Sequence, residues 1–88
     1  MLTEEEAVAC FDYIVNCRKA HTAICTHFCN PRKYALIPLV KYAVSLAKAD
    51  WDSNFQGREP HPTWRRHDAS TYYEQLVDLI LERKERFV

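Results

Sequence analysis

The stretch TEEEAVACFDYIVNCRKAHTAICTHFC, residues 3–29, decides the fold that we expect for this chain. Thr3 and Glu6 have the Thr-x-x-Glu spacing of a capping box, and the acidic side chains of residues 4–6 complement the positive end of a helix dipole. Asn30-Pro31 ends the pattern, because the residue before a proline is pushed out of the helical region. The stretch therefore predicts one helix over about 3–29. Such a helix is long for a small domain, which leaves a break near Ala20 to Thr22 as an alternative.

One face of this predicted helix is apolar and follows the heptad steps of a coiled-coil seam. We expect this face to be a self-association seam of a homodimer, formed by Cys10, Ile14, Cys17, His21, Ile24 and Phe28. His21 lies near the middle of the face and has two interpretations. It is either a core histidine hydrogen-bonded to another helix, or the polar residue that sets the register of an assembly and couples it to pH.

Two more helices are expected in the rest of the chain. Asn30 and Pro31 suit the N-cap and first position of a helix over 31–50. Pro38 leaves two alternatives, a short turn over 31–36 before a helix that starts near Pro38, or one helix that is kinked there. Residues 69–86 carry the apolar stripe of a third helix, and the segment 51–68 between them predicts a long loop. The fold class is therefore all-α, a small three-helix arrangement in a single domain over residues 1–88.

The composition narrows the function classes further. The chain has 88 residues, and its 12 basic and 12 acidic side chains balance, which argues against binding a polyanion through bulk charge. A single glycine disfavours a turn-rich all-β fold and excludes a glycine-rich phosphate loop.

The start of the chain lacks the pattern of a secretory signal, and no apolar run reaches the roughly 20 residues of a membrane span. We therefore expect a cytoplasmic protein with no membrane contact.

The four cysteines all lie in the first third of the chain, at Cys10, Cys17, Cys25 and Cys29. Their four-residue spacings suggest helical ligand pairs, but ligands about 18 Å apart along one helix cannot meet one zinc ion. A disulfide also needs closer Cβ atoms than the ~5–6 Å of an i,i+4 helical pair. The expectation is reduced thiols that serve as small buried hydrophobes, with no metal and no cofactor. A site that joins His21 to a nearby cysteine and to ligands elsewhere stays open.

Catalysis is not expected, because no nucleophile has a base and an oxyanion site at a recognisable spacing. Cys25 and His21 share a face that should be covered, where a thiol far from positive charge stays protonated. The sequence therefore predicts a protein that is not an enzyme.

The segment 51–68 is the predicted partner-binding surface, because it gathers tryptophan and arginine, the residue types that dominate binding hot spots. Its members are Trp51, Phe55, Arg58, Trp64, Arg65, Arg66 and His67. The competing interpretation is that Trp51 and Trp64 close the open end of the helix bundle. By elimination, we expect an adaptor or inhibitor that acts through a protein–protein interface, by analogy one encoded by a virus or mobile element and blocking a host machine. The alternative is a nucleic-acid-associated regulator that uses the basic helix 31–50 and Arg65-Arg66.

Overall fold

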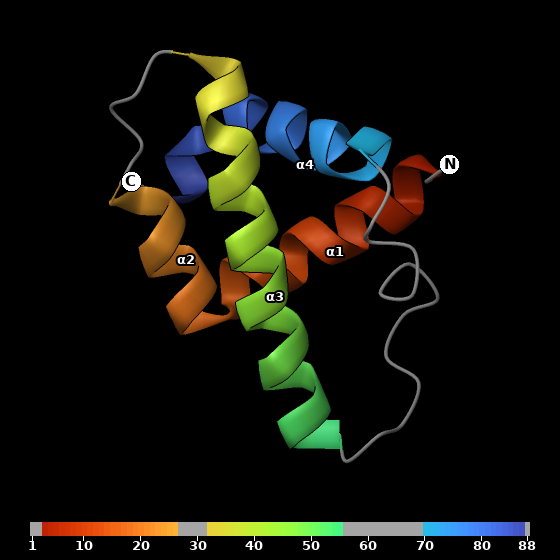
Figure 1. Cartoon of the computed structure of the whole chain (residues 1–88). Coiled ribbons are helices and arrows are strands. Elements are labelled where there is room, and N and C mark those ends of the chain that lie inside the picture. Colours follow the sequence, from red (N-terminus) through yellow and green to blue (C-terminus); the bar gives the residue numbers. More distant parts are fainter. Residues whose placement is uncertain (1–2, 27–31, 56–69, 88) are drawn as a thin grey trace.

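The computed structural model describes residues 3–26, 32–55 and 70–87, and within these ranges the protein is all-α, as predicted. Figure 1 shows the arrangement, in which α3 crosses in front of α1 and α4 while α2 lies along one side of α3. The elements are α1 (Glu4–Asn16), α2 (Arg18–Cys25), the 3₁₀ turn η1 (Lys33–Ala35), α3 (Leu36–Phe55), α4 (Ser70–Glu82) and the 3₁₀ turn η3 (Lys84–Arg86).

The predicted start of the first helix is confirmed. Thr3 has extended backbone dihedrals, and its Oγ1 accepts a hydrogen bond of 3.2 Å from the Glu6 N–H. This bond satisfies one of the N–H groups that the first turn of a helix leaves without an intrahelical partner. The three glutamates of the first turn lie at the positive end of the dipole, where they are stabilising.

The prediction of one helix over 3–29 is wrong, and so is the alternative break near Ala20 to Thr22. The chain leaves helical geometry at Cys17, whose φ of −79° and ψ of 110° are extended, and α2 begins at Arg18. A straight helix over 3–29 would measure about 40 Å at ~1.5 Å per residue. Since the molecule is only 37 Å along its longest axis, such a helix could not bury its whole apolar stripe against the others. The turn lets α1 pack against α4 while α2 packs against α3.

The second predicted helix follows the first of its two alternatives. The short turn η1 precedes α3, which begins at Leu36 and contains Pro38 in its first turn. A proline is tolerated there, because the N–H that it lacks would have no intrahelical acceptor. The predicted end at residue 50 is wrong. The helix continues to Phe55, so that residues 51–55 are helical and not part of a loop.

The last predicted helix, 69–86, is also shorter than expected, because α4 ends at Glu82. Arg83 leaves the helix with φ −116° and ψ 33°, and η3 then turns the chain so that Phe87 reaches the core. The Phe87 ring lies edge-on to Phe11 at 5.5 Å and stacks on His21 at 5.1 Å. A continuous helix would have carried this aromatic ring away from both partners.

The core is one cluster of buried side chains from all four helices and from Phe87. Ten of its large side chains are at most 2 % exposed, namely Phe11, Ile14, Ile24, Val40, Val44, Leu76, Val77, Ile80, Tyr72 and Phe87. Burial raises the pKa of the Tyr72 phenol, and the neighbouring Cys10 thiol raises it further. The phenol therefore stays neutral in the core.

We expect Phe87→Ala to lower the free energy of unfolding by about 3–5 kcal/mol, the usual effect of removing a buried phenylalanine ring. The ring is 2 % exposed and holds the C-terminal segment against α1 and α2. Urea denaturation measures the change. Leu81→Ala is the matched control, because Leu81 is 37 % exposed, and it should lose at most about 1 kcal/mol. Equal losses in the two variants would contradict the role assigned to Phe87.

Candidate protein-binding groove between α2 and α3

The predicted self-association seam lies inside a single chain wherever the structure describes it. Cys10, Ile14, Cys17 and Ile24 have exposed fractions of 0–4 % and belong to the core. Phe28 lies outside the described residues. A seam formed by these buried side chains would require the core to open, so a surface for self-association must be sought elsewhere on the molecule.

His21 is half-buried and tied to the C-terminal segment. Its Nε2–H donates to the carbonyl oxygen of Arg86 at 2.9 Å, and its ring stacks on Phe87. Arg86 in turn places its guanidinium 2.7 Å from Asp12 Oδ1 and over the ring of Phe11. These contacts match the first interpretation of His21, a histidine that is hydrogen-bonded within the fold.

The predicted partner-binding surface is described only at its first two residues. Trp51 is partly buried in α3, and its ring packs against Tyr13 of α1 with centroids 4.8 Å apart. Phe55 is the last residue of α3, and its side chain lies outside what the structure describes. The other members, Arg58, Trp64, Arg65, Arg66 and His67, also lie outside the described residues. The surface as a whole stays a prediction, but the Trp51 ring already contributes to the packing of α3 on α1.

A polar contact supports the same crossing. The Tyr13 hydroxyl donates to Asp50 Oδ2 at 2.8 Å, and Asn54 Nδ2 donates to the same oxygen at 3.2 Å. Burial, together with the hydrogen bond to the Asp50 carboxylate, raises the pKa of Tyr13 to about 12. The phenol therefore remains a neutral donor through the whole physiological range.

The part of the chain that the structure describes shows no group of three or more side chains able to hold a metal ion. Cys10 and Cys17 are buried and form no disulfide, and the partly buried Cys25 donates weakly to the Thr22 carbonyl oxygen at 3.7 Å. Cys29 lies outside the described residues. None of the described helices combines the length and apolar character needed to cross a bilayer.

Two of the basic residues predicted for a nucleic-acid surface are engaged with α4. Lys33 Nζ lies 2.6 Å from Asp78 Oδ1, and this bond raises the pKa of Lys33. Lys41 lies over the ring of Tyr73, with its Nζ 5.1 Å from the centroid. Because both cations already have partners in the fold, the second predicted helix presents a weaker positive field than its sequence suggests.

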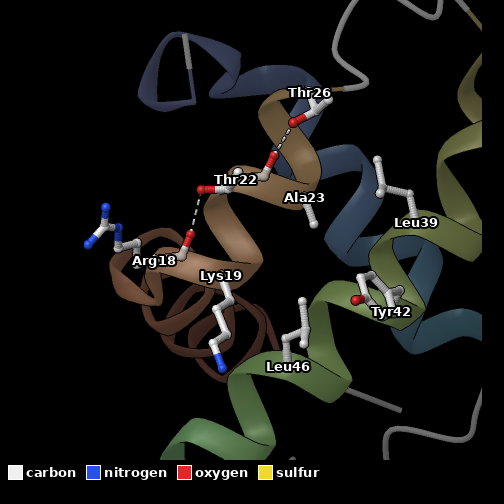
Figure 2. Close-up of a pocket in the computed structure, with 8 residues that line it drawn as sticks. All are labelled: Arg18, Lys19, Thr22, Ala23, Thr26, Leu39, Tyr42 and Leu46. Atoms are coloured by element: carbon white, nitrogen blue, oxygen red, sulfur yellow. Dashed lines mark hydrogen bonds between the residues drawn. The ribbon is translucent and has the colours of Figure 1, made fainter.

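An open groove with a volume of about 790 Å³ runs between α2 and α3 (Figure 2). Its eight lining residues are Arg18, Lys19, Thr22, Ala23, Thr26, Leu39, Tyr42 and Leu46. Four of those from α2 and its C-cap, at positions 19, 22, 23 and 26, follow the i, i+3, i+4, i+7 spacing of one helix face, and the three from α3 follow the i, i+3, i+7 spacing. None of the sequence patterns described above predicts this groove. The available signal was the frequent apolar side chains over residues 36–47, but such a pattern does not show which of them stay uncovered.

The groove offers little for polar recognition. The Thr22 hydroxyl donates to the Arg18 carbonyl oxygen at 2.8 Å, and the Thr26 hydroxyl donates to the Thr22 carbonyl oxygen at 2.6 Å, as Figure 2 shows. Both hydroxyl protons are therefore used within α2 and cannot be donated to a ligand. Apart from the charged Arg18 and Lys19, the rest of the lining is Ala23, Leu39, Leu46 and Tyr42, which is 58 % exposed.

The charge of the groove is positive only. Arg18 and Lys19 are its charged residues, no acidic residue lines it, and neither cation forms an ion pair within the described residues. Both lie in the first turn of α2, where a positive side chain opposes the helix dipole. The energetics of α2 alone therefore do not explain why two cations lie in its first turn.

Comparison of the chain with family models, curated proteins and solved structures gave no match, so its function has to be argued from this geometry.

We expect the stabilising effect of Tyr13 to disappear at high pH. The folded pKa of about 12 lies above the ordinary value of 10.0, so this contribution is complete below pH 10 and is lost as the pH rises through 12. Tyr13→Phe should cost about 1 kcal/mol at neutral pH, and the difference from wild type should shrink over this range. Denaturant titrations at a series of pH values measure it, and a difference that grows with pH would contradict the assignment.

We expect Lys19→Glu to raise the free energy of unfolding by about 0.3–1 kcal/mol at low ionic strength, because an acidic residue suits the first turn of α2. Thermal unfolding measures the gain, which should diminish with added salt. Lys84→Glu is the control, since Lys84 is exposed in η3 and outside any α-helix, and it should bring no such gain. A destabilised Lys19→Glu variant would show that Lys19 has a partner in the fold.

Proposed function

We propose that this chain is a small protein-binding module, an adaptor or inhibitor without catalytic activity, and that it docks an amphipathic helix of another protein in the groove between α2 and α3. The observation that carries the proposal is the groove itself, an open apolar surface between two helices with helix-spaced walls. A further helix is the element that fits such a surface, because its side-chain ridges pack into the groove between two others.

The chemistry of the groove favours a protein over a small molecule. A volume of about 790 Å³ lies within the ~300–1,000 Å³ of small-molecule sites, so size alone does not decide. Small-molecule sites, however, enclose most of the ligand and present convergent polar groups. This groove is open, and its two threonine hydroxyl protons are already donated within α2. An apolar helix face needs neither enclosure nor donors.

Tyr42 is the best candidate for a binding hot spot. It is 58 % exposed, whereas the other large apolar residues that the structure describes in α3 are buried or partly buried, and it combines a wide ring with a polar hydroxyl. Leu39 and Leu46 flank it one turn away on either side. Tyrosine in such a setting contributes strongly to protein–protein binding because its ring is large and stiff.

The cytoplasm is the compartment that we propose for this interaction, since Cys10, Cys17 and Cys25 form no disulfide and reduced cysteines fit a reducing compartment. We propose the segment 51–68 as a second contact surface, because it is rich in tryptophan and arginine. Trp51 is the exception, since its ring packs against Tyr13 of α1.

A photoreactive side chain at position 42 tests the groove in cells that make the protein. We expect it to cross-link one discrete partner, while the same group at position 34 does not. Tyr34 is the matched control, because it is 75 % exposed in η1 and does not line the groove. Adding Lys19→Glu should abolish the cross-link although that variant is no less stable.

Equal cross-linking at both positions would contradict the proposal, and so would a cross-linked product that survives Lys19→Glu. Loss of the product after nuclease treatment would favour the nucleic-acid alternative.

A further inference from the structure

We propose that the groove between α2 and α3 also accepts the outer face of α1 from a second copy of this chain, so that copies join head to tail. The inference rests on the proposed function, namely that the groove is a surface that docks helices. It goes beyond that function because it identifies an occupant whose own surface is visible in the same structure.

The outer face of α1 carries acidic side chains, which the groove lacks. Glu4, Glu5, Val8, Ala9 and Asp12 line a shallow depression on this helix, and four of them follow the i, i+3, i+4, i+7 spacing of one face. The helix contains four carboxylates and no basic residue. Asp12 forms an ion pair with Arg86, whereas Glu4 and Glu5 are exposed and form no ion pair within the described residues.

The two surfaces are complementary in charge. The groove has two unpaired cations and no acid, and the α1 face has two unpaired acids and no base. Val8 and Ala9 lie between the acids, and such small side chains let a helix backbone approach an apolar floor closely. Docking would bring Glu4 and Glu5 within reach of Arg18 and Lys19 while the apolar residues cover Tyr42 and its neighbours.

The α1 face of a chain cannot dock in the groove of the same chain. In Figure 1 the first turns of α1 and the helix α2 lie on opposite sides of α3. The proposed contact therefore joins two different patches, and such a heterologous contact continues from copy to copy unless the rotation closes a ring. It is also small, since eight residues line the groove against the 20–30 residues a side of a standard interface. We expect weak association that diminishes with salt.

The experiment measures mass by sedimentation equilibrium over about 10 µM to about 1 mM, the range of weak association. Tyr42→Arg disables the groove, and Ala9→Arg disables the α1 face. Both positions are exposed within helices, and arginine is a good helix former, so both variants should fold. The matched controls are Tyr34→Arg and Ala35→Arg, which place the same side chain on exposed residues of η1 that line neither surface.

The wild type and both controls should show a mass that rises with concentration past that of two chains. Each disabled variant should stay monomeric alone. A mixture of the two should form a complex of two chains and stop there, because only the intact groove of Ala9→Arg and the intact α1 face of Tyr42→Arg can meet.

A wild type that is monomeric throughout would overturn the inference. So would a disabled variant that still associates, or a mixture that stays monomeric. These results are distinguishable from failure of the proposed function, because the cross-link from position 42 to another protein would persist without self-association.

Discussion

The turn at Cys17 is the constraint on which the rest of this structure depends. It divides one apolar stripe between two helices, so that α1 meets α4 and α2 meets α3. Phe87 returns from the end of the chain to pack against Phe11 and His21, one residue on each side of the turn. Because the Phe87 ring contacts both helices, it helps to fix the angle between α1 and α2. A change in that angle would move α2 along α3 and alter the groove.

The same turn explains the distribution of charge. Starting a new helix at Arg18 puts two cations at the positive end of α2, where they oppose the dipole, while the three glutamates of α1 lie where they stabilise. A sequence selected for stability alone would place an acid in the first turn of α2. These two cations border the groove in which we propose that a partner helix docks.

The apolar surface that the sequence analysis assigned to self-association is largely consumed inside the chain. The buried cysteines and isoleucines of α1 and α2 fill the core together with α3 and α4. What remains outside is a smaller patch around Tyr42, with Leu39 and Leu46 only partly covered. Exposed aromatic surface bounded by aliphatic residues and cations is a feature of interaction sites more than of ordinary solvated helix faces. The proposals of partner binding and of head-to-tail contact both use this patch.

Local chemistry was sufficient for the features that involve neighbours in sequence. The Thr3 cap, the place of Pro38 near a helix start, the apolar faces and the all-α class all follow from interactions over one or two turns. Only the tertiary structure decided the turn at Cys17, the extension of α3 to Phe55, the end of α4 at Glu82 and the groove. A helical period is the same for one long helix and for two shorter ones that share a buried stripe, so periodicity cannot locate such a turn. Which apolar residues remain uncovered depends on contacts between residues far apart in the chain, and no local pattern records them.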